Sequence, residues 1–361
     1  MLRRLFKGSS SQSSQEKQAK EKEKAKYNLP RLAEVRSCEW PCEDFLKEAG
    51  IHEDFYALIE TAGLTGFIND RIDQYLLLTN TFVQNFYYYP KKSPPAVSFH
   101  LYDEFKEMSL RHFCAVCRIP YEGELEEPHR EDVDGFVKTI AVEEPKKGSE
   151  AKVSSIHFPV LRYFAIFASR CLIGRGNSGN LSVPDIIILQ HALLGDNTFS
   201  MGAVVAKRLA LNRTKGPIFG GIYAARLARH FQIPIRHHEK EETKLPPHIL
   251  DYKSMVAHKF IVDNEEKMLL YKLRFNKKHI EIIILPAPLL FDLLAENFLV
   301  TPEAVNNHRA QAFTPEPEPE PEPELDPYRA SSVQWDPEMT SQWYPDYTSH
   351  YTGESSGGPW Y

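Results

Sequence analysis

The stretch LSVPDIIILQHALLGDNTFSMGAVVAKRLALNRTKGPIFGGIYAARLARHFQIPI (residues 181–235) decides the fold expected for this chain. It is rich in apolar and small residues, and it contains no acid after Asp196. Apolar residues recur at helical spacing over residues 199–212 and 218–231, on either side of the breaker pair Gly216-Pro217. The stretch therefore predicts several helices that pack together.

The first helix of this stretch has clear end signals. Ser182 is a typical N-cap, Pro184 suits the first helical turn, and Gly195 suits the C-terminal end. Upstream, Pro159 likewise suits the first turn of a helix.

Cations are spread along the same stretch, and they form a candidate nucleic-acid-binding set, named here the basic set: Lys207, Arg208, Arg213, Lys215, Arg226, Arg229 and Arg236. Helical spacing brings Lys207 near Arg208 and places Arg226 and Arg229 on one face. Such a set can neutralise phosphates with a strong salt dependence. The alternative is that these cations solvate the outer faces of helices or pair with acids elsewhere in the chain.

Small residues in GAVVA (202–206) and GGIYAARLA (220–228) allow helices to approach closely. That property suits either the core of a monomer or an interface between subunits. The sequence leaves both alternatives open.

The chain also resembles a known family, in five blocks that occur in the same order and spacing: SVPDIIILQHALLGD, FSMGAVVAKRLALNR, KGPIFGGIYAARLARHF, LDYKSMVAHKFI and LPAPLLFD. The family is the Athila open-reading-frame-one type of plant retrotransposon protein, encoded in or beside the gag position of gypsy-class elements. The resemblance covers roughly residues 81–300 and implies a transposon-derived origin. It implies no catalytic residues. Proteins from the gag position commonly self-associate, so the resemblance also implies a homo-oligomer.

Two short motifs resemble known sites but lack the surroundings that those sites need. GRGNSG (174–179) matches GxGxxG, yet no strand precedes it and no helix follows it at once, so we expect an interhelical loop. Cys114 and Cys117 form a single CxxC without a second pair, so we expect two partly buried thiols and no metal site. No aspartic-protease or polymerase motif is present, and we expect no enzyme, no cofactor and no small-molecule substrate.

Composition separates the chain into a centre and two tails of opposite charge. Residues 1–36 hold ten Lys or Arg against four Glu, whereas residues 313–361 hold ten acids against one Arg and include PEPEPEPEPE. Five cysteines, an odd number, suggest free thiols in a reducing compartment, so we expect a cytoplasmic or nuclear protein. No run of about 20 apolar residues occurs, and we expect no membrane span.

We expect an α+β fold that is mainly α-helical, with two helical lobes, small β-hairpins and disordered tails. The expected divisions are 1–26, a basic tail; 27–150, a lobe with a hairpin at 97–108 and an acidic loop at 121–150; 151–312, a helical Orf1-like domain; and 313–361, an acidic and aromatic tail. Within the third division we expect a helix over 248–262 and a hairpin over 267–285.

The function expected from these features is that of a retrotransposon-derived, gag-like, non-enzymatic structural protein. It is expected to self-associate and to bind RNA or DNA. Two alternatives stay open: a protein-interaction module without a nucleic-acid role, and a functionally inert remnant of the element.

Overall fold

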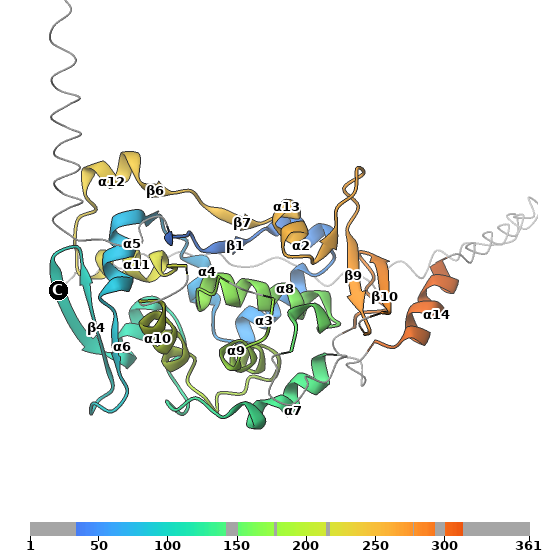
Figure 1. Cartoon of the computed structure of the whole chain (residues 1–361), viewed down its shortest axis with the longest axis horizontal. Helices are drawn as coiled ribbons and strands as arrows, with labels where there is room; N and C mark the ends of the chain where they lie inside the picture. The colour runs from blue at the N-terminus through green and yellow to red at the C-terminus, as the bar shows by residue number, and fades with distance from the viewer. Residues whose placement is uncertain are drawn as a thin grey trace, which may run out of the picture. The chain divides into compact units, whose positions relative to one another are not determined.

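The computed structural model describes residues 34–141, 151–176, 179–213, 217–276, 278–292 and 300–312 (Figure 1). The α-helices in this part of the chain are α2 (Glu43–Glu48), α3 (His52–Thr61), α4 (Thr65–Asn69), α5 (Leu76–Gln84), α6 (Leu110–Cys117), α7 (Arg130–Ile140), α8 (Pro159–Phe167), α9 (Val183–Leu194), α10 (Met201–Asn212), α11 (Gly221–His230), α12 (His237–Glu242), α13 (Tyr252–Ala257) and α14 (Pro302–Ala312). A 3-10 turn, η2 (Val153–Ser155), precedes α8, and a π-helical turn, η3 (Ala168–Leu172), follows it.

The strands are short: β1 (Glu39–Pro41), β2 (Gln74–Tyr75), β3 (Tyr87–Tyr89), β4 (Ala96–Leu101), β5 (Glu104–Ser109), β6 (Lys244–Leu245), β7 (His248–Leu250), β8 (Ile261–Val262), β9 (Leu270–Arg274) and β10 (Ile280–Ile284). They form two antiparallel three-stranded sheets, β3-β4-β5 and β10-β9-β8. Two further pairs are the parallel β1-β7 and the antiparallel β2-β6. Each of these two pairs joins an early segment of the chain to a late one.

The core is centred on α8, whose nine residues are all buried. Helices α3 and α9 pack against α8 (Figure 1). Tyr163 stacks on Phe45 at 5.7 Å and meets Phe55 edge-on at 5.4 Å. Aromatic pairs of this geometry add to the free energy gained from burial of the rings.

Several sequence predictions are confirmed. Ser182 caps α9. The backbone N–H and the hydroxyl of Ser182 donate hydrogen bonds to the Asp185 carboxylate, at 2.7 and 2.6 Å. Gly195 ends this helix in the left-handed conformation, with φ of 63°. Both hairpins are present, as β4-β5 and β9-β10.

The prediction of a loop over residues 121–150 is wrong for its central part, which is the helix α7. Three apolar residues at helical spacing, Val133, Val137 and Ile140, are buried and attach α7 to the core. Asp132 accepts a hydrogen bond from the His129 backbone N–H at 3.0 Å and closes the N-terminus. A few apolar residues are thus enough to attach a helix to the core when they share one face of that helix.

The prediction of one helix over residues 248–262 is also wrong. The segment holds β7, the short helix α13 and β8 in turn. Pairing with β1 at one end and β9 at the other holds the chain extended there, because strand pairing outweighs local helical spacing.

The structure is a mixed α/β fold with small sheets. The described residues up to Gln311 belong to one compact unit, and two lobes are not confirmed. The reason is visible in the strand pairs: β1 and β2 lie in the first predicted lobe, and their partners β7 and β6 lie in the second.

In the described part of the chain, no helix has both the length and the apolar character needed to cross a lipid bilayer.

Candidate nucleic-acid interface

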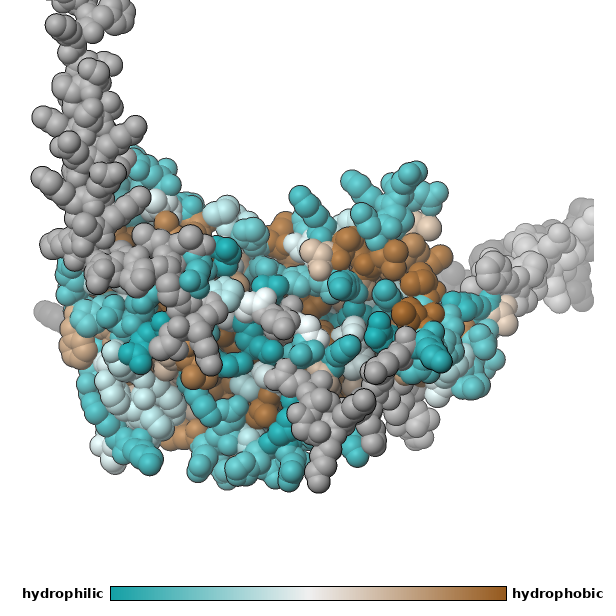
Figure 2. Space-filling model, in the orientation of Figure 1, coloured by the Kyte–Doolittle hydropathy of each residue, from teal (hydrophilic) through white to brown (hydrophobic). Residues whose placement is uncertain are grey.

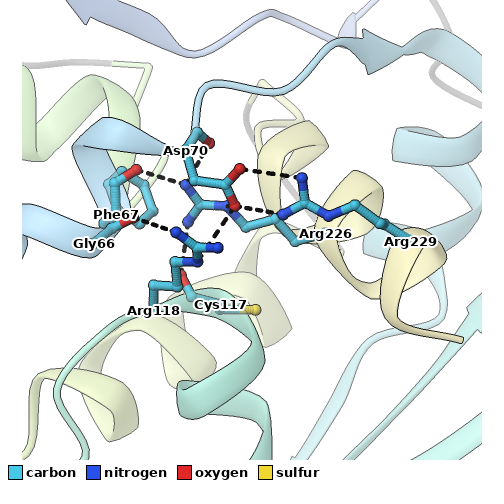
Figure 3. Close-up of polar contacts among 7 residues, drawn as sticks. All are labelled: Gly66, Phe67, Asp70, Cys117, Arg118, Arg226 and Arg229. Atoms are coloured by element: carbon cyan, nitrogen blue, oxygen red, sulfur yellow. Dashed lines mark hydrogen bonds and ion pairs between the residues drawn. The ribbon is translucent and has the colours of Figure 1, made fainter. Parts of the chain in front are cut away.

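Three arginines surround Asp70, the residue that follows α4 (Figure 3). Arg229 Nη1 donates to Asp70 Oδ1 at 3.1 Å, while the Nε atoms of Arg226 and Arg118 each lie 3.4 Å from Asp70 Oδ2. The hydrogen bond from Arg229 lowers the pKa of Asp70, and the charges of Arg226 and Arg118 act in the same direction against the effect of burial. Asp70 is therefore ionised at neutral pH and neutralises part of the basic set.

Arg226 is a structural residue of this cluster, since it is only 1% exposed. Its guanidinium donates to the carbonyl oxygens of Phe67 at 2.5 Å, Cys117 at 2.6 Å and Asp70 at 2.8 Å. Two of these carbonyls lie at the C-terminal ends of α4 and α6, where carbonyls lack helical partners. Arg226 thereby joins α11 to two other helices. Because its guanidinium is buried, it is not accessible to a phosphate.

The cations of α10 lie beside other acids. Lys207 forms an ion pair with Glu127 and keeps half of its side chain exposed. Arg208 lies near Asp185: burial raises the pKa of Asp185, against the opposing charges of Arg175 and Arg208.

The remaining members of the basic set are Arg213, Arg236 and Lys215. Arg213 lies over the Tyr87 ring, 4.3 Å from its centre. Arg236 pairs with Asp103 at 3.0 Å, beside the turn of the β4-β5 hairpin. Lys215 lies outside the described residues. The structure thus does not bring the six described members together into one cationic surface.

A different group of basic residues surrounds a cavity of about 440 Å³, named here the basic cavity. These residues come from the start of η2, from α8, from η3, from the end of α13 and from β9: Lys152, Arg162, Arg170, His258, Lys259, Lys272 and Arg274. Gly176, Gly179 and Asn180 complete part of the wall. Its volume lies in the range of small-ligand sites.

Glu39 of β1 is an acid that contacts this group. It accepts from His258 Nε2 at 2.9 Å and lies 3.9 Å from Arg170 Nε. Burial opposes the ionisation of Glu39, but the hydrogen bond from His258 and the charge of Arg170 outweigh it and lower the pKa of Glu39. Four other cations of the cavity have no ion pair within the part of the chain that the structure describes: Lys152, Lys259, Lys272 and Arg274. Positive charge therefore exceeds negative charge here.

The basic cavity was not predictable from the sequence, because its residues are spread over more than 120 positions and no local pattern unites them. One local signal does exist. Arg162 and Arg170 interrupt the otherwise apolar and small-residue run FPVLRYFAIFASRCLIG (158–174). Because an arginine inside an apolar helix must find partners in the interior, such a residue indicates a buried polar feature.

Neither of the two motifs forms the site that it resembles. The GxGxxG motif lies between η3 and α9, and the side chain of Asp185 occupies the N-terminus of α9, where a phosphate would have to bind; residues 177 and 178 lie outside the described part. Cys114 and Cys117 are both buried, which raises the pKa of Cys114 to about 12 and that of Cys117 well above its usual range. Among the described residues, no three His, Cys, Asp or Glu side chains are placed to hold a metal ion.

The small residues of α10 and α11 serve the core of the chain itself. A Cβ on Gly202 would clash with Cys114 Sγ, and a Cβ on Gly221 would lie 2.6 Å from the Gln74 side chain. These glycines allow α10 to approach α6 and α11 to approach β2.

A model of the ATHILA ORF-1 family matches residues 8–196, more than half of the chain. The match includes the first part of the region that carries the resemblance, and it extends toward the N-terminus. No curated protein matches the chain, and no solved structure does.

Proposed function

The chain belongs to the ATHILA ORF-1 family and is thus retrotransposon-derived, and on that premise we propose that it is a gag-like, non-enzymatic structural protein that binds nucleic acid and self-associates. The observation that supports nucleic-acid binding is the basic cavity, where cations outnumber acids. In the described basic set, by contrast, Asp70, Glu127 and Asp103 offset much of the charge.

Nucleic acid is the partner whose chemistry fits this excess of charge. Phosphates are bound by Lys and Arg with release of counterions, and binding therefore weakens as salt rises. Arg229 and Lys207, each about half exposed, extend the cationic surface at other places on the molecule.

Self-association is supported by an apolar face of β10. Ile280, Ile282 and Ile284 alternate with Glu281 and Ile283, and they are 36%, 38% and 59% exposed. Figure 2 shows a hydrophobic patch over the β9-β10 region. Exposed apolar patches commonly mark sites of protein–protein contact. Sedimentation velocity over a concentration series tests whether the full chain forms oligomers.

Binding of the full chain to a single-stranded RNA, followed by fluorescence anisotropy between 50 and 200 mM salt, tests the nucleic-acid role. About four phosphate contacts predict a loss of affinity on the order of 10- to 100-fold over that range. The variant Lys259→Glu/Lys272→Glu should weaken binding strongly at low salt.

A matched control is Lys91→Glu/Lys240→Glu, which changes the net charge equally at exposed positions outside the basic cavity. Equal weakening by both variants would indicate a general charge effect. No binding by the wild type at 50 mM salt would reject the nucleic-acid role.

The second candidate function, a protein-interaction module, is favoured by another cavity of about 480 Å³. Trp40, Tyr75, Ile235 and Ile249 line it, and Arg71 lies 5.5 Å from the centre of the Trp40 ring. Aromatic and apolar walls of this kind suit a protein side chain. The RNA titration separates the two functions, since this one predicts no RNA binding.

A further inference from the structure

A buried arginine, Arg162, is among the residues that line the basic cavity. Arg162 is 1% exposed, and its guanidinium lies near the Phe260 and Tyr271 rings, 5.5 and 5.4 Å from their centres. Its two terminal nitrogens donate to backbone carbonyl oxygens, that of Lys272 at 2.8 Å and that of Lys259. Its Nε has no hydrogen-bond partner among the described residues.

Among the described residues, no carboxylate forms an ion pair with Arg162, so this side chain brings into the protein a positive charge that is hydrogen-bonded to carbonyl oxygens. Carbonyl oxygens satisfy N–H groups but do not neutralise the charge, and a buried charge is costly unless an opposite charge compensates it. The same two carbonyls belong to residues whose own side chains lie at the cavity, so the backbone that holds Arg162 also holds Lys259 and Lys272 there.

Four further cations add positive charge around the cavity. Lys152, Lys259, Lys272 and Arg274 have no ion pair in the described part of the chain. The carboxylate of Glu39 is already held by His258 and Arg170. An anion that enters the cavity thus meets several cations, whereas Glu39 does not line the cavity and is already paired with two of them.

The shape of the site restricts the anion. An internal phosphodiester carries one negative charge and binds along an extended groove, whereas a phosphate monoester carries about 1.5 to 2 charges at pH 7 and offers three acceptor oxygens. A cavity of about 440 Å³ lined by several cations suits one compact, multiply charged group better than a strand that must pass through.

The neighbouring strand supplies an apolar side to the same face. In the β9-β10 pair, Ile282 lies opposite Lys272 and Ile280 lies opposite Arg274. Side chains of directly paired residues share a face of the sheet. Apolar surface beside cations can contact the face of a base that is attached to a phosphate.

We propose that the basic cavity binds the terminal phosphate of a nucleic acid chain. This inference rests on the proposed nucleic-acid-binding function and names the part of the nucleic acid that the site takes. Arg162 supplies the fixed charge, and Lys259, Lys272 and Arg274 contact the phosphate oxygens. Ile280 and Ile282 lie beside the terminal nucleoside, whereas Ile284, the most exposed of the three isoleucines, stays available for self-association.

The test uses the full chain and one RNA sequence in three forms: with a 5′-phosphate, with a 3′-phosphate, and with hydroxyl groups at both ends. At equal ionic strength, one phosphate-ended form should bind about tenfold more tightly than the hydroxyl-ended form, since hydrogen bonds to charged groups are the stronger ones. Inorganic phosphate alone should compete weakly, because it lacks the nucleoside.

Lys272→Gln/Arg274→Gln should abolish the difference between the forms, while Lys91→Gln/Lys240→Gln should retain it. Unfolding midpoints of both variants show whether they fold. Equal affinity of the wild type for all three forms would overturn the inference and leave nucleic-acid binding intact. Inorganic phosphate competing as well as the phosphate-ended RNA would assign the cavity to a free anion and also overturn it. No binding of any form would reject the proposed function itself.

Discussion

Arg226 shows how one residue of the basic set differs from its neighbours. Its guanidinium donates to two buried carbonyls and one part-buried carbonyl and forms an ion pair with the Asp70 carboxylate, a geometry that a lysine cannot reproduce with one ammonium group. We predict that Arg226→Lys lowers the free energy of unfolding by about 3 kcal/mol, because buried carbonyls lose their donors. Urea denaturation measures the change.

Arg229→Lys is the matched control, three residues along the same helix. Its side chain is 53% exposed and it pairs with the same Asp70. The expected loss is below about 1 kcal/mol, as for other exposed ion pairs. Similar losses for the two variants would contradict the structural role assigned to Arg226.

At the scale of elements, Glu239 links α12 to α5. It is buried and accepts from the backbone N–H groups of Leu77 at 2.6 Å and Leu78 at 3.1 Å, in the first turn of α5, and from the Tyr102 hydroxyl. Burial raises the pKa of Glu239, although these hydrogen bonds oppose the shift. The folded chain therefore holds the Glu239 proton more tightly than the unfolded chain does.

This raised pKa predicts a pH dependence of stability. The pKa of Glu239 is about 4.5 in the unfolded chain and higher in the folded chain. As pH rises through these two pKa values, ionisation of Glu239 favours the unfolded chain. The wild type should therefore lose stability relative to Glu239→Gln over that rise. Unfolding free energies from pH 4 to 8 measure the difference, with Glu241→Gln as the control for removal of one charge. A difference that stays constant with pH would contradict the assignment.

Two helical glycines should respond oppositely to alanine. A Cβ on Gly202 in α10 would clash with Cys114 Sγ and lie 3.1 Å from the Pro120 carbonyl oxygen, whereas a Cβ on Gly135 in α7 would have no atom within 4 Å. We predict that Gly202→Ala lowers the free energy of unfolding by about 1–3 kcal/mol through overpacking. Gly135→Ala should raise it by about 0.5–1 kcal/mol, the difference in helix preference. Urea denaturation measures both changes, and equal effects would show that α10 does not approach α6 as closely as described.

At the scale of the whole molecule, net charge of −6 opposes the binding of a polyanion. Residues 314–361 contribute ten acids and one arginine to it. We predict that deletion of these residues raises RNA affinity at low salt and that the gain falls as salt rises, because screening weakens repulsion between distant charges. Fluorescence anisotropy at low and high salt measures the gain in affinity and its dependence on salt. A chain with the same acids changed to amides is the control, and unchanged affinity of both would reject the effect.

Local features of the sequence determined much of the fold. The caps at Ser182 and Gly195, the hairpin alternation and the helical spacing of α10 and α11 act between residues close in the chain, so they were predictable. The family was also evident from local blocks. By contrast, α7 was missed because its three buried residues are few, and α13 was placed in too long a helix because its flanking strands pair with distant partners.

Which cations remain available to a ligand depended on the folded chain. The sequence located the charges of the basic set, yet it did not reveal that Asp70 lies among three arginines or that Arg226 is buried. Nor did it reveal that Lys152 and Arg274 meet at one cavity. The physical reason is that ion pairing and burial depend on distances in space between residues far apart in sequence, whereas caps and periodicity depend on neighbours along the chain.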